Sequence, residues 1–278
     1  MSGRKRTVNI ASLLKLSLAL FFLVMMIFPF GLVLINAFKS RMEIIQSPLA
    51  LPGSWSFDNF ITAWKTMSYH VVLGNTLYIT ALSQIVLIVF SAMFAYLLVR
   101  WNWKINKFIF FMLVCAMIIP FQSLMIPFVS IFGKLGMMNS RTAMVFFYLG
   151  FGMPMTTFMY HGFMKGISKE MEEAAMIDGC SYFSCFWRMV FPNLKSITVT
   201  ILIINILWIW NDFLLPSLVL IKENTRTIPL STFYFFGEYT AEFGLAMAAL
   251  IMSVLPVIVI YLFLQKHIIA GVMDGAIK

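Results

Sequence analysis

The sequence has 278 residues, of which 61% are hydrophobic and only 11% charged, and its mean hydropathy is +0.92. Soluble domains are about 45 to 50% apolar and about 25% charged, so this composition excludes an ordinary soluble domain and indicates an integral membrane protein. The formal net charge of +9 comes from basic residues spread over the flanks of apolar segments. That distribution does not fit a nucleic-acid-binding surface, so we expect no nucleic acid partner.

Six apolar segments are each long enough to cross a bilayer, because a spanning helix needs about 20 mostly apolar residues. They cover about residues 16–35, 72–99, 108–132, 143–163, 197–220 and 245–265. The sequence therefore predicts an all-α integral membrane protein with six transmembrane helices. Arg4, Lys5 and Arg6 precede the first segment as in a signal peptide, but no cleavage motif follows, so we expect a retained helix.

Along the chain, we expect three parts. Residues 1–70 hold the N-terminal segment, the first helix and the first external loop. Residues 71–265 form the main transmembrane domain, and residues 266–278 form a tail. Most of the 20 Lys and Arg residues lie with the termini and with the second and fourth loops. Because basic loops stay in the cytoplasm, both termini and the long loop 164–196 are expected to be cytoplasmic.

Acidic residues gather in that loop, although the whole chain has only 11 Asp and Glu. Glu170, Glu172 and Glu173 would occupy the first turn of a helix capped by Ser168, where the helix dipole favours negative charge. At about 100° per residue, Ala174, Ala175 and Gly179 share one low-profile face, which also carries Asp178.

An apolar stripe follows in the same loop, at Phe183, Phe186, Trp187 and Val190, and it ends at Pro192. We expect this stripe to lie against the membrane helices as a support. Periodicity alone leaves two interpretations open. The acidic helix either docks in a groove of another protein, or it is an amphipathic helix on the membrane surface with a solvated acidic start.

The spacing of this loop resembles a family motif. Glu173-Ala174-Ala175, three residues, Gly179, nine residues and Met189-Val190-Phe191-Pro192 resemble the EAA loop of binding-protein-dependent ABC importer permeases. Met189 and Phe191 replace the Ile and Leu that are usual there, and both remain apolar. Residues 210–216, 237–244 and 265–278 are similar to the carbohydrate-uptake permeases, in particular to the maltose-permease-G-like subunit.

This resemblance implies a type I ABC importer permease fold and a non-catalytic subunit without cofactor or metal. It implies that the loop docks on a separate ATPase through Glu173, Ala174, Ala175, Asp178, Gly179 and Pro192. It also implies an external loop that contacts a solute-binding protein through Phe235, Phe236, Gly237, Glu238 and Tyr239. The chain itself has no Gly-x4-Gly-Lys-Ser/Thr phosphate-binding loop.

The expected partners are a second, different permease, two ATP-hydrolysing subunits, an extracellular solute-binding protein, a sugar or polyol substrate and the lipid bilayer. The expected location is the plasma membrane of a bacterium or archaeon. In this assembly the chain would form half of the translocation pathway.

Candidates for the pathway lie late in the fifth segment, where Asp212 is the only acidic residue inside any of the six apolar segments. An ionisable group at membrane depth is costly, so Asp212 should face the protein interior or a water-filled cavity. Asn205, Trp210 and Asn211 are its neighbours and could contact sugar hydroxyls and ring faces. Alternatively, these polar groups hydrogen-bond other helices or backbone freed near Pro216.

Two other classes of protein compete with this interpretation. A secondary transporter or channel, independent of ATP, should carry paired ionisable groups in its spans, whereas Asp212 is nearly alone. A membrane enzyme would need a nucleophile and base or metal ligands. The three cysteines form no CxxC motif and the three histidines are scattered, so the sequence shows no metal-binding or catalytic cluster that would favour a membrane enzyme.

Overall fold

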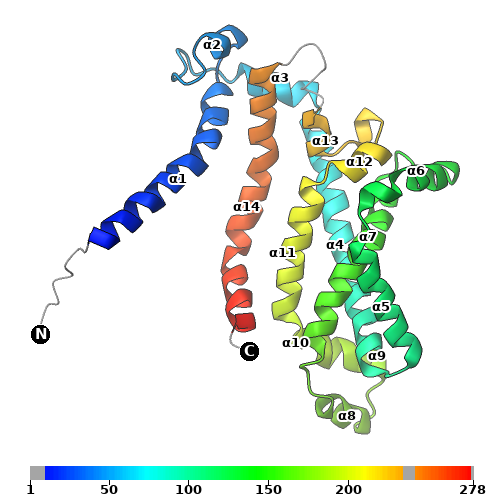
Figure 1. Ribbon diagram of the computed structural model, residues 1–278. Helices are drawn as coiled ribbons and strands as arrows, with labels where there is room; N and C mark the ends of the chain where they lie inside the picture. The colour runs from blue at the N-terminus through cyan, green and yellow to red at the C-terminus, as the bar shows by residue number, and fades with distance from the viewer. Residues whose placement is uncertain (1–9, 234–241, 277–278) are drawn as a thin grey trace, which may run out of the picture. The chain divides into compact units, whose positions relative to one another are not determined.

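The structure is a computed structural model that describes residues 10–233 and 242–276. These residues form helices joined by turns, without a strand among them, so the expectation of an all-α protein is confirmed. The chain divides into two compact units, which are residues 1–67 with 232–254 and residues 68–231 with 255–278. Figure 1 shows the order of the helices.

The first unit contains α1 (Ile10–Asn36), α2 (Arg41–Gln46), α3 (Asp58–Thr66) and the beginning of α14 (Phe243–Ala276). Side chains hold the connection after α1 by binding backbone carbonyls. The Asn36 amide donates to the Pro48 carbonyl, and the buried Lys39 ammonium donates to the Ser47 carbonyl, both at 2.9 Å. The Asn59 amide donates to the carbonyls of Ala37 and Lys39 at 2.8 Å, which fastens α3 to the end of α1.

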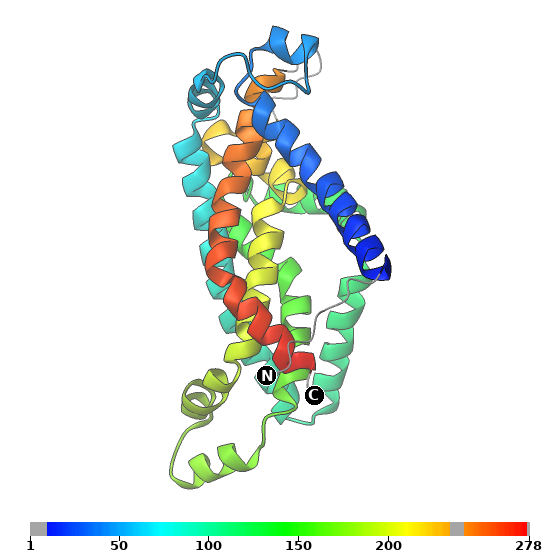
Figure 2. The same ribbon diagram turned by 90° about the vertical axis from the view of Figure 1, so that its left-hand side faces the viewer.

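The core of the second unit is a bundle of α4 (Tyr69–Arg100), α5 (Lys104–Ile118), α7 (Arg141–Met164) and α11 (Lys195–Asn211). These helices lie side by side in both views (Figures 1 and 2). Gly152 of α7 lies where α4 and α11 meet it. A Cβ atom at this position would lie 3.0 Å from Leu87 Cδ2 and from Trp208 Cζ3, so the absence of a side chain permits the close approach.

Short elements connect the bundle helices. They are η1 (Phe121–Leu124), α6 (Met125–Lys134), α8 (Glu170–Ile177), α9 (Tyr182–Cys185), the π-helical turn η2 (Phe186–Val190), α10 (Phe191–Asn193), α12 (Leu214–Val219), η3 (Glu223–Thr225) and α13 (Ile228–Phe233).

Four stretches of the described helices are long and apolar enough to cross a membrane unbroken, namely Leu13–Asn36, Tyr69–Arg100, Arg141–Met164 and Phe243–Phe263. Two further candidates are bent helix pairs. Lys104–Ile118 and Phe121–Lys134 meet at 97°, and Tyr182–Asn193 and Lys195–Asn211 meet at 77°. The number of spans is therefore four, or up to six if each bent pair forms one.

The third and fifth expected spans differ from the continuous runs that composition predicts. Segment 108–132 is interrupted at Pro120, because a proline disfavours the helical conformation of the residue before it, and Ile119 is extended with φ −75° and ψ 117°. Segment 197–220 is interrupted at Asp212, which is extended with φ −69° and ψ 128°. Hydropathy alone does not reveal either break, since the apolar residues continue across it.

Candidate functional site

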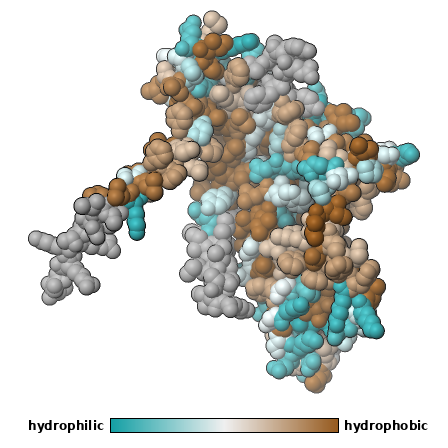
Figure 3. Space-filling view, in the orientation of Figure 1, coloured by the Kyte–Doolittle hydropathy of each residue, from teal (hydrophilic) through white to brown (hydrophobic). Residues whose placement is uncertain are grey.

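The segment from α8 to α10 lies at one end of the second unit, beyond the ends of α4 and α7 (Figures 1 and 2). Hydrophilic residues gather over this end of the unit in Figure 3. The exposed charged residues there include Lys165, Lys169, Glu170, Glu173 and Asp178. The segment therefore has the polar surface of a part that projects from the apolar bundle.

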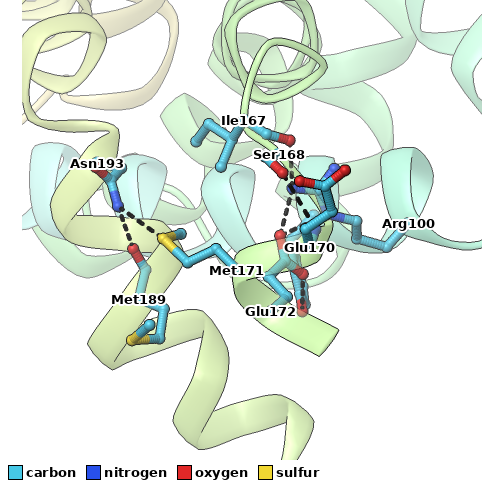
Figure 4. A network of polar contacts seen from close by, with 9 residues as sticks. Arg100, Ile167, Ser168, Glu170, Met171, Glu172, Met189 and Asn193 are labelled. Atoms are coloured by element: carbon cyan, nitrogen blue, oxygen red, sulfur yellow. Dashed lines mark hydrogen bonds and ion pairs between the residues drawn. The ribbon is translucent and has the colours of Figure 1, made fainter. Parts of the chain in front are cut away.

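Glu172 anchors α8 to the end of α4 (Figure 4). Its carboxylate is buried and forms an ion pair with Arg100, whose Nε donates to Glu172 Oε1 at 2.8 Å. The Tyr96 hydroxyl donates to Oε2 at 2.9 Å. Arg100 also donates to the Ile167 carbonyl at 3.2 Å, so both groups of the buried pair have further partners. Such a pair fixes the position of the helix, because breaking it would leave an uncompensated buried charge.

Sequence reasoning did not identify this role, because it treated the three glutamates of the first turn alike. The available signal was periodicity. Met171, Glu172, Ala175 and Met176 are buried or half-buried, whereas Glu173, Ala174 and Ile177 are exposed. Glu172 thus lies on the inward face of α8, together with Met171 and Met176. An acidic residue that is buried on this face needs a basic partner.

The outward face of α8 carries Glu173, Ala174 and Ile177, and the Ile177 side chain is 86% exposed. Tyr182 and Phe183 of α9 are also exposed, at 56% and 64%, so this polar end carries several exposed apolar side chains that are candidate contacts for another protein. Ala174 is exposed and Ala175 half-buried, so the two alanines do not form the single low-profile surface that helical spacing predicts.

Gly179 ends α8 and does not lie on its side. The helix stops at Ile177, and Gly179 has φ +86°. The Gly179 N–H donates to the Met176 carbonyl and the Cys180 N–H to the Ala175 carbonyl, both at 3.0 Å, which is a Schellman motif. Asp178 is exposed in this turn. At the other end, the cap position of α8 is Lys169 and not Ser168 as expected, although the Ser168 hydroxyl accepts the Glu170 N–H at 3.2 Å.

The apolar stripe after α8 packs against the bundle as expected for Phe186 and Val190, which are buried together with Tyr96 and Tyr160. Trp187 is half-buried and Phe183 is 64% exposed. Pro192 itself is exposed, and the turn before it is widened into the π-helix η2, with the Phe191 N–H donating to the Phe186 carbonyl. This widening removes the clash that a proline ring makes with the carbonyl four residues earlier.

The pathway candidates separate in the structure. Asn205 is buried, and its amide donates to Thr156 Oγ1 of α7 at 3.1 Å. Trp210 is 1% exposed. The Asn211 amide donates to the Leu207 carbonyl of its own helix at 2.7 Å.

Of the four, Asp212 lines a cavity of about 330 Å³. Its carboxylate accepts the Tyr148 hydroxyl at 3.0 Å and the Leu214 N–H at 2.9 Å, so it also caps α12. The cavity lies where α5 and α11 break, and its other lining residues are Ala116, Met117, Ile119, Phe121, Gln122, Leu124, Phe151, Trp208, Leu214 and Leu215.

The remaining expected contacts, Phe235, Phe236, Gly237, Glu238 and Tyr239, lie outside the described residues. Within residues 10–233 and 242–276, no cluster of three or more His, Cys, Asp or Glu side chains is placed to hold a metal ion.

The sequence matches the family model of the binding-protein-dependent transport system inner membrane component over residues 84–274. It is 41% identical over 273 residues to the probable starch degradation products transport system permease protein AmyC of Thermoanaerobacterium thermosulfurigenes, covering 98% of this chain and 99% of that protein. It is 38% identical over 251 residues to the melibiose/raffinose/stachyose import permease protein MelC of Bacillus subtilis (strain 168), covering 90% of this chain and 91% of that protein.

The fold is similar to a chain in the crystal structure of a bacterial ABC transporter involved in the import of the acidic polysaccharide alginate. The TM-score is 0.78, with 20% identity, over 96% of this chain and 99% of that chain. At this identity the similarity concerns the fold alone.

Proposed function

Because the chain belongs to the family of binding-protein-dependent transport system inner membrane components, we propose that it is a permease subunit of a sugar importer driven by ATP. One relative is named as a probable permease for starch degradation products and another as a melibiose/raffinose/stachyose import permease. These names support the proposal that the substrate is a sugar. In this proposal, the chain forms half of a translocation pathway with a second, different permease. Two separate subunits hydrolyse ATP, and an extracellular binding protein delivers the sugar.

The segment from α8 to α10 is the proposed coupling element. The observation that carries this proposal is the division of α8 into two faces. Glu172 is held in a buried ion pair with Arg100, while Glu173, Ala174 and Ile177 face outward. A protein that docks on the outward face would push on a helix that is fixed to the end of α4, so movement would pass into the bundle.

Gly179 and Pro192 shape this element and do not need to touch the partner. Gly179 terminates α8, and Pro192 follows the π-helical turn that packs Phe186 and Val190 against the bundle. Asp178, like Glu173, is exposed and available to basic groups of an ATPase.

A contribution to the sugar pathway is proposed for the Asp212 cavity. Trp208, which is 39% exposed, offers an aromatic face, and Asp212 and Gln122 offer polar groups for hydroxyls. Binding sites formed where spanning helices break are common in transporters. Asn205, Trp210 and Asn211 have structural partners or are buried away from this cavity, so we assign them to helix packing.

Contact with the binding protein through Phe235 to Tyr239 remains a proposal from the family resemblance. Deletion of these five residues should abolish stimulation of ATP hydrolysis by the binding protein without preventing assembly. Normal stimulation of the deletion variant would contradict this contact.

The coupling proposal is tested with Ile177→Asp and Glu173→Lys in the chain co-expressed with its partner subunits. Loss of one partner of a buried charge pair costs about 2 to 5 kcal/mol, and Ile177→Asp would bury an unpaired charge, so both variants should retain far less ATPase subunit on purification and lose sugar uptake. Glu223→Lys is the control at the opposite end of the unit, because its carboxylate is 90% exposed and its ion pair with Arg226, at 3.8 Å, should contribute less than about 1 kcal/mol. Wild-type ATPase retention and uptake in both α8 variants would show that the helix is only a surface feature.

A further inference from the structure

A large cavity at the α8 end of the second unit lies beside the proposed coupling element and shares Arg100 with it. Its volume is about 610 Å³, and it lies between the end of α4, the start of α5 and the end of α7. It is lined by Leu98, Val99, Arg100, Trp101, Asn102, Asn106, Lys107, Phe110, His161, Lys165, Ile167, Ser168 and Lys169. This volume falls within the roughly 300 to 1,000 Å³ of small-molecule sites.

The lining is strongly basic. Lys107, Lys165 and Lys169 contribute three ammonium groups, and no carboxylate is among the lining residues. Arg100 is neutralised by Glu172, whereas none of the three lysines has an ion-pair partner within the described residues. Lysines from α5 and from the connection between α7 and α8 therefore line one cavity without neutralisation, which favours an anion.

Buried, packed side chains form one wall of this cavity. His161 is 7% exposed and its ring stacks on Phe110, with the ring centroids 3.8 Å apart. Asn106 is buried and donates to the carbonyls of Leu97 and Trp101 at 3.2 and 2.7 Å, which holds the turn between α4 and α5. The three lysines are exposed at the rim of the cavity, while its wall is held by these buried contacts.

The position of the cavity along the helices indicates the source of the anion. Arg100 is the last residue of α4, Lys107 lies in the first turn of α5, and Lys165 directly follows α7. Spanning helices end at the headgroup layer, where tryptophans also gather, and Trp101 and Trp103 lie at this level. From this level, α5 continues with exposed Phe108, Phe111 and Met112, an apolar surface suited to acyl chains.

We propose that this cavity binds the phosphate headgroup of an anionic phospholipid, with the three lysines as its ligands and the acyl chains along α5. Basic pockets between transmembrane helices bind anionic headgroups in the same manner. A free phosphate compound shares the headgroup's charge but not the apolar tail, so the two sources can be distinguished. The inference concerns a lipid ligand, so it holds or fails independently of ATPase coupling and of the sugar.

The test uses the whole transporter in nanodiscs of equal parts phosphatidylcholine and phosphatidylglycerol. After transfer to detergent, native mass spectrometry measures which lipids remain bound. The variant is Lys107→Gln/Lys165→Gln/Lys169→Gln. Each basic residue near an anionic lipid contributes roughly a factor of five, so the variant should bind phosphatidylglycerol on the order of 100-fold more weakly.

Two controls accompany this variant. Lys104→Gln/Lys134→Gln/Lys222→Gln removes three exposed lysines outside the cavity and should leave phosphatidylglycerol enrichment at the wild-type level. Replacing the three cavity lysines by arginine should preserve the enrichment, which separates loss of charge from misfolding. Equal phosphatidylglycerol retention by the glutamine variant and the wild type would overturn the proposal.

A second arm measures inorganic phosphate binding to the delipidated transporter. We expect no saturable binding that depends on the three lysines. Tight binding of phosphate that is lost in the glutamine variant would assign the cavity to a soluble anion and would reject the lipid.

Discussion

Glu172 and Glu173 are adjacent in the sequence, yet they have opposite environments. Glu172 is buried against Arg100 and Tyr96, while Glu173 is exposed on the outward face of α8. A buried paired carboxylate and an exposed one differ in energetic weight by several kcal/mol. At the scale of single residues, the motif therefore contains one glutamate that positions the helix and one that can meet a partner.

Glu172→Ala should loosen α8, because it leaves the buried Arg100 charge without its partner. The expected cost is about 3 to 5 kcal/mol, to be seen as faster trypsin cleavage at Lys169 and a lower unfolding temperature. Glu173→Ala is the matched control and should change stability by less than about 0.5 kcal/mol. Equal cleavage rates for the two variants would mean that the ion pair does not hold the helix.

Gly179 provides a second prediction. Its left-handed φ of +86°, and not its small size, explains why glycine occupies this position. No atom lies within 4 Å of a Cβ built at this position, so bulk alone is tolerated. Asn adopts the left-handed conformation more readily than Ala, for which it costs about 1 to 2 kcal/mol. Gly179→Asn should therefore retain more stability and sugar uptake than Gly179→Ala.

The alternative for Gly179, a partner surface that approaches closely, predicts the reverse order, because Asn is larger than Ala. Gly162→Ala is a suitable control. This glycine is in α7 with free space around it, and alanine there should be neutral or stabilising by up to about 1 kcal/mol. Better uptake with Gly179→Ala than with Gly179→Asn would show that size matters and not backbone conformation.

Among the elements, the broken pair of α5 and α6 illustrates how two causes act together. Pro120 favours the extended conformation of Ile119, and Phe128 of α6 packs against Phe147 with ring centroids 4.8 Å apart. The proline explains where the break occurs. The packing of Phe128, which is 6% exposed, explains why α6 turns by 97° at that point.

We therefore expect Pro120→Ala alone to preserve the bend and Pro120→Ala/Phe128→Ala to lose it. Spin labels at positions 104 and 134 measure the difference. At 1.5 Å per residue, the labelled ends lie about 30 Å apart in the bent pair and about 45 Å apart in a straight helix. Ile126→Ala is the control, because Ile126 of α6 is 84% exposed and should not affect the distance. A long distance in Pro120→Ala alone would mean that packing does not hold the bend.

For the whole molecule, the two ends of the second unit differ in chemistry. One end carries α8 and the cavity lined by Lys107, Lys165 and Lys169. At the other end, the Asn75 amide donates to the carbonyls of Asn224 and Arg226, both at 2.9 Å, which ties α4 to the connection around η3. Positive charge favours the cytoplasmic side, so we propose that the α8 end and both chain termini are cytoplasmic.

This orientation is tested by single cysteines at Ser168 and Asn224, both of which are exposed. The background replaces Cys115, Cys180 and Cys185, which are free thiols. In intact cells, an impermeant maleimide should label position 224 and should reach position 168 only after the membrane is opened. Labelling of position 168 from outside would invert the orientation and would place the lipid site in the outer leaflet.

Much of the fold could be predicted from composition and spacing, because both act locally. A run of about 20 apolar residues must form a helix in a bilayer to satisfy its backbone, so the described spans α1, α4, α7 and α14 follow from the sequence. The EAA spacing likewise indicated the family, which the matched residues 84–274 confirm. Local signals also indicated that Phe186 and Val190 would be buried.

Contacts between distant residues could not be predicted in this way. Arg100 and Glu172 are 72 positions apart, and Tyr148 and Asp212 are 64 apart, so no local period connects them. The 97° turn after Ile118 depends on the packing of Phe128 against α7, and Tyr148 of α7 bonds Asp212 at the break after Asn211. The cavity at these breaks exists only when the helices assemble. The same holds for the lysine-lined cavity, whose basic groups come from three segments. The sequence by itself determined the helices and the family, since burial and backbone hydrogen bonding in a bilayer are properties of each segment. Only the tertiary structure decided which glutamate anchors α8 and which lysines line one cavity, since these depend on which segments meet.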